Sequence, residues 1–216
     1  MSDKAEKKEL LLDSGVIGVI RTESPKELLK VARAIKKGGV SCIEIAMTTP
    51  NALSVIEEVL EKLDEVLVGA GTVLDAETAR SAILAGAEYL VSPTTDVGMI
   101  EMARRYDKIV APGAFTPTEV MTAWEAGADM VKIFPASRLG PKFISDVKAP
   151  LPQVSLMPTG GVNQENAEEF VRAGADVLCV GSALLDKEAI DNENYDILTQ
   201  NAKELVEAVE KGRKKK

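Results

Sequence analysis

The chain has 216 residues, with 26 Lys plus Arg against 34 Asp plus Glu, a net charge of −8 and no histidine. An acidic chain lacks the clustered basic face that binds nucleic acid, so we expect no nucleic-acid partner. Without histidine, the commonest metal ligand and general base are missing, which excludes zinc sites and Ser-His or Cys-His nucleophile systems. Acid-base chemistry must come from Glu, Asp, Lys or Tyr.

The two cysteines, Cys42 and Cys179, lie in apolar runs and have no metal-ligand spacing. This usage favours a reduced, cytoplasmic protein that binds no metal. Residues 1–8 contain no apolar signal region, and no stretch of about 18 apolar residues is free of charge. We therefore expect neither secretion nor insertion into a membrane, and we interpret the basic residues at 211–216 as a solvated helix end.

Short apolar runs recur along the chain and predict eight strands. Continuous rather than alternating apolar runs are typical of parallel strands buried on both faces. The predicted strands are Val16–Ile20, Cys42–Ala46, Val66–Ala70, Tyr89–Ser92, Ile109–Ala111, Met130–Phe134, Ser155–Pro158 and Val177–Val180.

The segments between these runs have helical periodicity and helix start signals such as Ser24-Pro25, Thr116-Pro117 and Asn163. Glycines at 38–39, 86, 127 and 174 predict left-handed helix ends that lead directly into the next strand. The predicted helices with clear start signals are Lys26–Lys37, Ala52–Leu63, Thr118–Ala126 and Gln164–Ala173. We also expect a helix at about 3–12 and, after a surface loop at 191–194, one from about Tyr195 onward.

Strands that alternate with helices predict an α/β fold, a single-domain (β/α)8 TIM barrel over residues 1–216. Its parts are an extra N-terminal helix at 1–14, a barrel core at 15–185 and a C-terminal helix at 195–213. An open doubly wound sheet is the alternative. No Gly-x-Gly-x-x-Gly follows the first predicted strand, which disfavours it.

Two charged residues interrupt the apolar strands, Lys132 between Val131 and Ile133 and Glu44 between Ile43 and Ile45. Burial favours the neutral amine of a lysine, which attacks a ketone carbonyl to form a Schiff base. A buried carboxylate could then transfer the protons. The competing interpretations are a lysine whose ammonium reaches solvent and a structural buried ion pair.

Glycine-rich turns follow the last two predicted strands, at Gly160-Gly161 and Gly181-Ser182. Free backbone N–H groups at such turns cradle phosphate, although ordinary tight turns remain the alternative. Arg21 ends the first predicted strand and is suited to a ligand carboxylate, or to a salt bridge with a neighbouring loop. The loop Gly69-Ala70-Gly71-Thr72 allows a similarly close approach of a ligand.

The sequence resembles the 2-keto-3-deoxy-6-phosphogluconate (KDPG) and 2-keto-4-hydroxyglutarate (KHG) aldolase family from about Gly15 to Leu185. These are class I aldolases on a (β/α)8 barrel. The resemblance is carried by Val19-Ile20-Arg21, Gly39-Val40, Ile43-Glu44-Ile45, Gly69-Ala70-Gly71-Thr72-Val73, Gly86-Ala87-Glu88, Val91-Ser92-Pro93, Pro112-Gly113, Thr116-Pro117-Thr118-Glu119, Val131-Lys132-Ile133-Phe134-Pro135-Ala136, Pro158-Thr159-Gly160-Gly161-Val162 and Val180-Gly181-Ser182.

This resemblance implies that Lys132 is the Schiff-base lysine and Glu44 the general acid/base, with no metal or other cofactor. It places Thr72 and Thr159 near the pyruvyl moiety, and the phosphate at Gly160, Gly161, Gly181 and Ser182. Pro93 and Phe134 are further substrate-binding positions that it implies. Some members carry an arginine four residues after the glutamate, where this chain has Thr48, so the substrate carboxylate would depend more on Arg21.

The implied reaction is reversible cleavage of KDPG, a small 2-keto acid, to pyruvate and glyceraldehyde 3-phosphate. The same chemistry on 4-hydroxy-2-ketoglutarate or on 2-keto-3-deoxy-6-phosphogalactonate is the enzymatic alternative. Members of the family are typically homotrimers. A different class of function is a non-catalytic scaffold, in which the barrel is retained, or was engineered, as the subunit of an oligomeric assembly.

Overall fold

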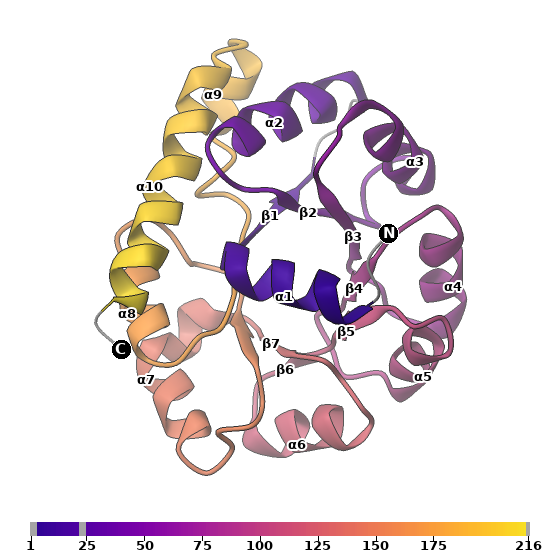
Figure 1. Ribbon diagram of the computed structural model, residues 1–216, viewed down its shortest axis with the longest axis vertical. Helices are drawn as coiled ribbons and strands as arrows, with labels where there is room; N and C mark the ends of the chain where they lie inside the picture. Colours follow the sequence, from indigo (N-terminus) through magenta and orange to yellow (C-terminus); the bar gives the residue numbers. More distant parts are fainter. Residues whose placement is uncertain (1–3, 22–24, 215–216) are drawn as a thin grey trace.

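A ring of parallel strands surrounded by helices forms the body of the molecule (Figure 1). The computed structural model describes residues 4–21 and 25–214. The strands are β1 (Val16–Ile20), β2 (Cys42–Ala46), β3 (Leu67–Gly71), β4 (Tyr89–Val91), β5 (Ile109–Ala111), β6 (Gly113–Ala114), β7 (Val131–Ile133), β8 (Leu156–Pro158) and β9 (Leu178–Val180). The helices are α1 (Lys4–Ser14), α2 (Pro25–Lys37), α3 (Ala52–Lys62), α4 (Ala76–Leu84), α5 (Val97–Arg105), α6 (Pro117–Glu125), α7 (Ala136–Lys148), α8 (Ala167–Arg172), α9 (Lys187–Asp191) and α10 (Tyr195–Arg213).

The strands pair in two parallel groups that together form the barrel. One group has the order β5-β4-β3-β2-β1-β9, and the other has the order β6-β7-β8. A bridge between Thr159 and Cys179 joins β8 to β9, and β5 continues into β6 after a single residue, Pro112. The predicted (β/α)8 barrel is confirmed, and the open doubly wound sheet is wrong.

The fifth predicted strand continues beyond its expected end and is interrupted at Pro112. Proline has no backbone N–H to donate to the ladder, although its carbonyl still accepts from Lys132 N at 2.9 Å. The next backbone N–H, that of Gly113, donates to Thr94 O at 3.1 Å instead of to a strand. The ladder therefore changes partner here, from β4 before the proline to β7 after it.

Residues on each strand point alternately into the barrel and outward to the helices. On β1, Ile17 and Val19 belong to an interior apolar cluster, whereas Val16 and Ile20 pack in a second cluster between strands and helices. Burial on both faces accounts for the continuous apolar runs in the sequence. The same alternation decides which way a polar residue on a strand points.

Most predicted element bounds agree with the structure to within three residues, and the predicted left-handed glycines after α2, α4, α6 and α8 are confirmed. The helix expected from Gln164 begins only at Ala167, because the side chain of Asn163 accepts from two backbone N–H groups and forms a turn. The loop expected from Asp191 is partly wrong, since Asp191 ends α9. The helix start expected at Ser24 lies outside the described residues.

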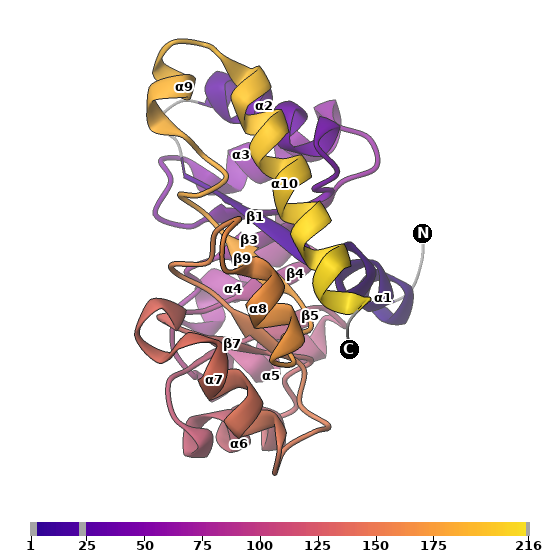
Figure 2. The same cartoon turned by 90° about the vertical axis from the view of Figure 1, so that its left-hand side faces the viewer.

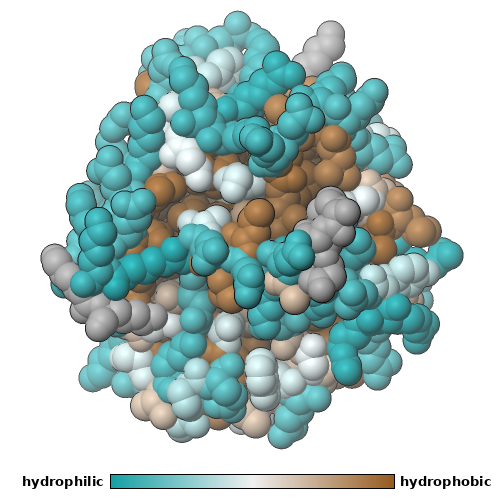
Figure 3. Space-filling model, viewed as in Figure 1, coloured by the Kyte–Doolittle hydropathy of each residue, from teal (hydrophilic) through white to brown (hydrophobic). Residues whose placement is uncertain are grey.

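Helix α1 lies across the end of the barrel where the strands begin (Figures 1 and 2). Its Leu11 is fully buried in the interior cluster, and Lys4 forms an ion pair with Asp129 at 2.8 Å. The guanidinium of Arg213 on α10 also donates to the carbonyl oxygens of Asp13 and Leu12. Leu10 of α1 is exposed, and apolar side chains gather in the hollow beside the helix (Figure 3). Helix α1 thus covers this end of the barrel, which we call the closed end.

Among the described residues, every helix is too short or too polar to cross a membrane.

Candidate active site

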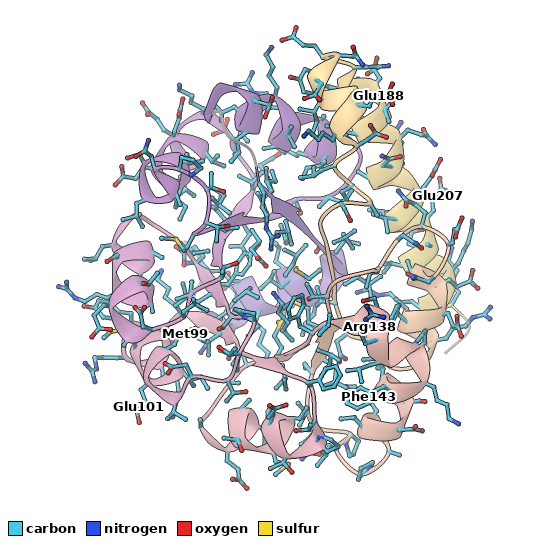
Figure 4. The ribbon with its side chains drawn as sticks, turned by 180° about the vertical axis from the view of Figure 1, so that it is seen from behind. Met99, Glu101, Arg138, Phe143, Glu188 and Glu207 are labelled. Atoms are coloured by element: carbon cyan, nitrogen blue, oxygen red, sulfur yellow. The ribbon has the colours of Figure 1, made fainter. Side chains whose placement is uncertain are left out.

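A cavity of about 530 Å³ opens at the end of the barrel opposite α1, where the strands end. Figure 4 looks into this end: side chains from the strands converge at the centre, whereas Glu101, Glu188 and Glu207 lie on the outer sides of helices. The cavity is lined by Val19, Arg21, Glu44, Thr72, Pro93, Lys132, Phe134, Thr159, Gly160, Gly161, Val162, Cys179, Gly181, Ser182 and Leu185. Loops after parallel strands meet at this end, where enzymes on this fold place their sites.

Lys132 points into the cavity because its neighbours on β7, Val131 and Ile133, pack outward against the helices. Its side chain is almost fully buried, at 5% exposure. The ammonium nitrogen lies 5.1 Å from the centre of the Phe134 ring, which attracts a cation. The sequence alternative of a lysine reaching solvent is therefore wrong.

Glu44 occupies the corresponding position on β2, between the outward-facing Ile43 and Ile45, and is 1% exposed. Its Oε2 accepts a hydrogen bond from the thiol of Cys179 at 3.3 Å. A Cβ at Gly71 would overlap its Oε1, so the glycine provides the space that the carboxylate fills.

The two buried charges share the cavity without forming an ion pair. Among the described residues, neither Lys132 nor Glu44 has an oppositely charged side chain within 4.0 Å. The alternative of a structural buried ion pair is therefore wrong. Unpaired charges cost stability in a protein interior, and such groups concentrate at functional sites.

The glycine turn after β8 is fixed by the start of α7. Gly160 and Gly161 have φ values of 85° and 83°, in the left-handed region that favours glycine. The backbone N–H of Ser137 donates to Gly160 O at 2.8 Å, and a Cβ at 161 would collide with the side chain of Ser137. Gly181 and Ser182, after β9, line the same cavity. This arrangement can accept an anion on backbone N–H groups.

Of the remaining predicted site residues, five line the cavity and one does not. Those that line it are Arg21, Thr72, Pro93, Phe134 and Thr159. Thr72 has a φ of 59°, a rare conformation for a β-branched residue, and such strain is characteristic of functional loops. Thr48 is exposed in the turn after β2 and lies outside the cavity lining, so the structure does not bring it together with the other predicted site residues.

Four lining residues were not predicted from the sequence: Val19, Cys179, Val162 and Leu185. The position of Cys179 in an apolar run gave no sign of its hydrogen bond to Glu44. Strand alternation could have found it, because Cys179 lies two residues before Gly181 and therefore faces the same interior.

Comparison with known proteins assigns the family. The profile of the KDPG and KHG aldolase family matches residues 8–201. A 2-dehydro-3-deoxy-phosphogluconate aldolase of Treponema pallidum is 31% identical over 90% of this chain and 93% of its own. A 2-dehydro-3-deoxy-6-phosphogalactonate aldolase of Escherichia coli K12 is 35% identical over 78% of this chain and 82% of its own.

A solved structure of similar fold contains a reaction intermediate. It is a KDPG aldolase of Legionella pneumophila, with pyruvate captured at low pH as a covalent carbinolamine. It superposes with a TM-score of 0.85, is 28% identical and covers 92% of this chain and 97% of its own. With the family profile spanning most of the barrel, these similarities show that the chain belongs to the KDPG and KHG aldolase family.

Proposed function

We propose that this protein is a class I aldolase that reversibly cleaves KDPG to pyruvate and glyceraldehyde 3-phosphate. The observation that carries the proposal is a buried lysine without a charged partner, Lys132, in one cavity with the buried carboxylate of Glu44. The relatives named above as KDPG aldolases, and the carbinolamine in the Legionella structure, support the same chemistry.

In the cleavage direction, the neutral amine of Lys132 attacks the C2 ketone and forms a carbinolamine, which takes up a proton and loses water to give an iminium ion. Glu44 then takes the proton of the C4 hydroxyl, directly or through a water. The C3–C4 bond breaks, its electron pair moves into the iminium, and glyceraldehyde 3-phosphate leaves. The remaining enamine takes a proton on C3 from Glu44, and hydrolysis releases pyruvate and regenerates Lys132.

These steps need no metal, because the iminium nitrogen accepts the electrons of the breaking bond. We therefore expect cleavage at an unchanged rate after dialysis against EDTA, measured as the release of pyruvate. A loss of activity that Mg²⁺ or Zn²⁺ restores would contradict this part of the proposal.

The glycine turns favour a phosphorylated substrate over 4-hydroxy-2-ketoglutarate. Gly160, Gly161 and Gly181 offer backbone N–H groups, and Ser182 adds a hydroxyl to the lining of the same cavity. Arg21 is the cation for the substrate carboxylate. Ser182→Ala should lower kcat/KM for KDPG more than for 4-hydroxy-2-ketoglutarate, and equal effects would contradict the phosphate assignment. Relative kcat/KM values for the gluconate and galactonate epimers would decide between those two substrates.

The homotrimer expected from the resemblance is part of the proposal. A second hollow, of about 370 Å³, adjoins the cavity at Pro93 and Phe134 and contains the exposed apolar side chains of Val97 and Phe115. A second copy of this chain would cover these side chains. Light scattering should therefore find a trimer, and Phe115→Glu should shift it toward the monomer. A large closed particle without turnover would support the scaffold alternative instead.

Both cysteines are free thiols, which supports the expected reducing, cytoplasmic location.

The decisive experiment is incubation with pyruvate and sodium borohydride, followed by peptide mass spectrometry. We expect one reduced pyruvyl adduct, on Lys132. Surface lysines in the same sample serve as the internal control, because they share the reagent but not the cavity. A folded protein with no adduct, or with adducts spread over surface lysines, would overturn the proposed function.

A further inference from the structure

The general acid/base of the proposed reaction is held by a residue that the reaction itself does not use. The Cys179 thiol lies 3.3 Å from Glu44 Oε2, and both side chains are almost completely buried. The two residues are 135 positions apart in the sequence and meet because β2 and β9 both flank β1. Cys179 also lines the cavity, so this contact lies at the wall of the site.

The direction of the hydrogen bond follows from the surroundings of the thiol. Burial, followed by the negative charge of Glu44, raises the pKa of the Cys179 thiol well above its ordinary value. The thiol therefore stays protonated at neutral pH and donates a hydrogen bond to the carboxylate of Glu44. A buried thiol of this kind is a poor nucleophile, which argues against a covalent role for Cys179.

The carboxylate of Glu44 is confined from two sides. Oε2 is held by the thiol of Cys179, and Oε1 lies against the backbone of β3 at Gly71, where a Cβ would overlap it. Among the described side chains, the Cys179 thiol is the hydrogen-bond donor that the structure gives to this carboxylate. Buried carboxylates require such donors, and a misplacement of about 1 Å in a reacting group costs roughly 100-fold in rate.

We propose that Cys179 is a positioning residue, whose thiol donates to Oε2 of Glu44 and thereby fixes the position of the carboxylate for both proton transfers. A thiol is a weak donor, so it orients the carboxylate while withdrawing little of its charge. Glu44 thus stays able to take the C4 hydroxyl proton and to return a proton to C3. This inference rests on the proposed aldolase function.

The test compares Cys179→Ala with Cys42→Ala. Cys42 is also fully buried in the barrel interior, two residues before Glu44 on the same strand, and it serves as a control that removes the same volume.

In Cys179→Ala, kcat for KDPG cleavage and the exchange of pyruvate methyl protons in D₂O should both fall roughly tenfold or more. KM and the borohydride adduct on Lys132 should stay close to wild type. Cys179→Ser, which keeps a donor, should recover most of the loss, and Cys42→Ala should show none.

A spectroscopic measurement tests the hydrogen bond independently of turnover. Because Cys42 and Cys179 are the chain's two cysteines, the S–H infrared stretch of Cys42→Ala belongs to Cys179 alone. It should lie at the low wavenumber of a hydrogen-bonded thiol and rise when Glu44→Gln is added.

The outcomes separate this inference from the proposed function. Wild-type kcat in a folded Cys179→Ala protein, equal losses in the two alanine variants, or an S–H band that Glu44→Gln leaves unmoved would overturn the positioning role. A wild-type protein that neither cleaves KDPG nor forms the pyruvyl adduct would instead overturn the aldolase function.

Discussion

Charged side chains are paired at one end of the barrel and unpaired at the other. At the end closed by α1, each of three carboxylates is paired: Glu88 with Lys7 and Lys108, Asp129 with Lys4, and Asp176 with Lys148. At the open end, Lys132 and Glu44 are more deeply buried and have no oppositely charged side chain within 4.0 Å among the described residues.

The paired charges at the closed end therefore contribute to stability, and the unpaired charges at the open end contribute to reactivity. At the closed end, Asp129 also accepts the backbone N–H of Val110 at 3.0 Å, and Asp176 accepts that of Leu156 at 2.8 Å, so the carboxylates fix where neighbouring strands begin. At the open end the charges remain available to a substrate. Changes at the open end should therefore affect turnover, and changes at the closed end should affect folding.

The largest effect is expected from Lys132→Ala, which removes the Schiff-base nucleophile and should abolish turnover. Lys132→Met, which keeps more of the side-chain volume, should be equally inactive. Because a buried polar group without a charged partner is replaced by an apolar side chain, the free energy of unfolding of the methionine variant should equal or exceed that of wild type. Pyruvate release and urea denaturation measure the two quantities. Wild-type activity in either variant would eliminate the mechanism.

Gly71→Ala should come next, because its new Cβ overlaps Oε1 of Glu44 and forces the carboxylate to move. We expect kcat to fall roughly 100-fold while Lys132 still forms the borohydride adduct with pyruvate. Circular dichroism checks that the barrel is folded. A folded variant with normal kcat would show that the position of Glu44 does not limit the reaction.

At the closed end, Glu88→Gln should lower stability in a pH-dependent way. Burial raises the pKa of Glu88, but hydrogen bonds from Lys108 and Lys7 lower it by more, so the net shift is downward. Its contribution is therefore present above the unfolded pKa of about 4.3 and is lost as pH falls through the folded value. We expect the variant to be less stable by about 1 kcal/mol at pH 7.

Urea denaturation of both proteins at pH 7 and near pH 3 measures this difference, which should shrink in acid. The folded variant should keep wild-type kcat, since Glu88 is not among the residues that line the cavity. A difference that grows in acid would reverse the sign of the proposed linkage.

The smallest effect is expected from Tyr89→Phe, in the interior between the two ends. The Tyr89 ring is buried over Gly69, and its hydroxyl has no hydrogen-bond partner among the described groups. Burial of a polar group without a partner costs free energy, so its removal should raise the free energy of unfolding by roughly 1 kcal/mol. Thermal unfolding measures the change. A destabilised variant would indicate that the hydroxyl is satisfied in solution.

Local sequence patterns determined the strands, the alternation with helices and the two central residues of the site. Val16–Ile20, Cys42–Ala46 and Ile109–Ala111 are strands with the predicted bounds, because an apolar run buried on both faces is recognisable without its partners. Lys132 and Glu44 could be identified because a charge in such a run is costly and thus conspicuous. The family motifs then gave these residues their expected roles.

Only the tertiary structure decided which side chains meet. Thr48 follows β2 closely in sequence, yet it is exposed and lies outside the cavity lining, whereas Cys179 reaches Glu44 across 135 positions. The absence of an ion pair between Lys132 and Glu44 likewise depends on the width of the barrel. Local periodicity fixes the face on which a residue lies, but the distance between faces depends on how all strands pack, which no short stretch of sequence contains.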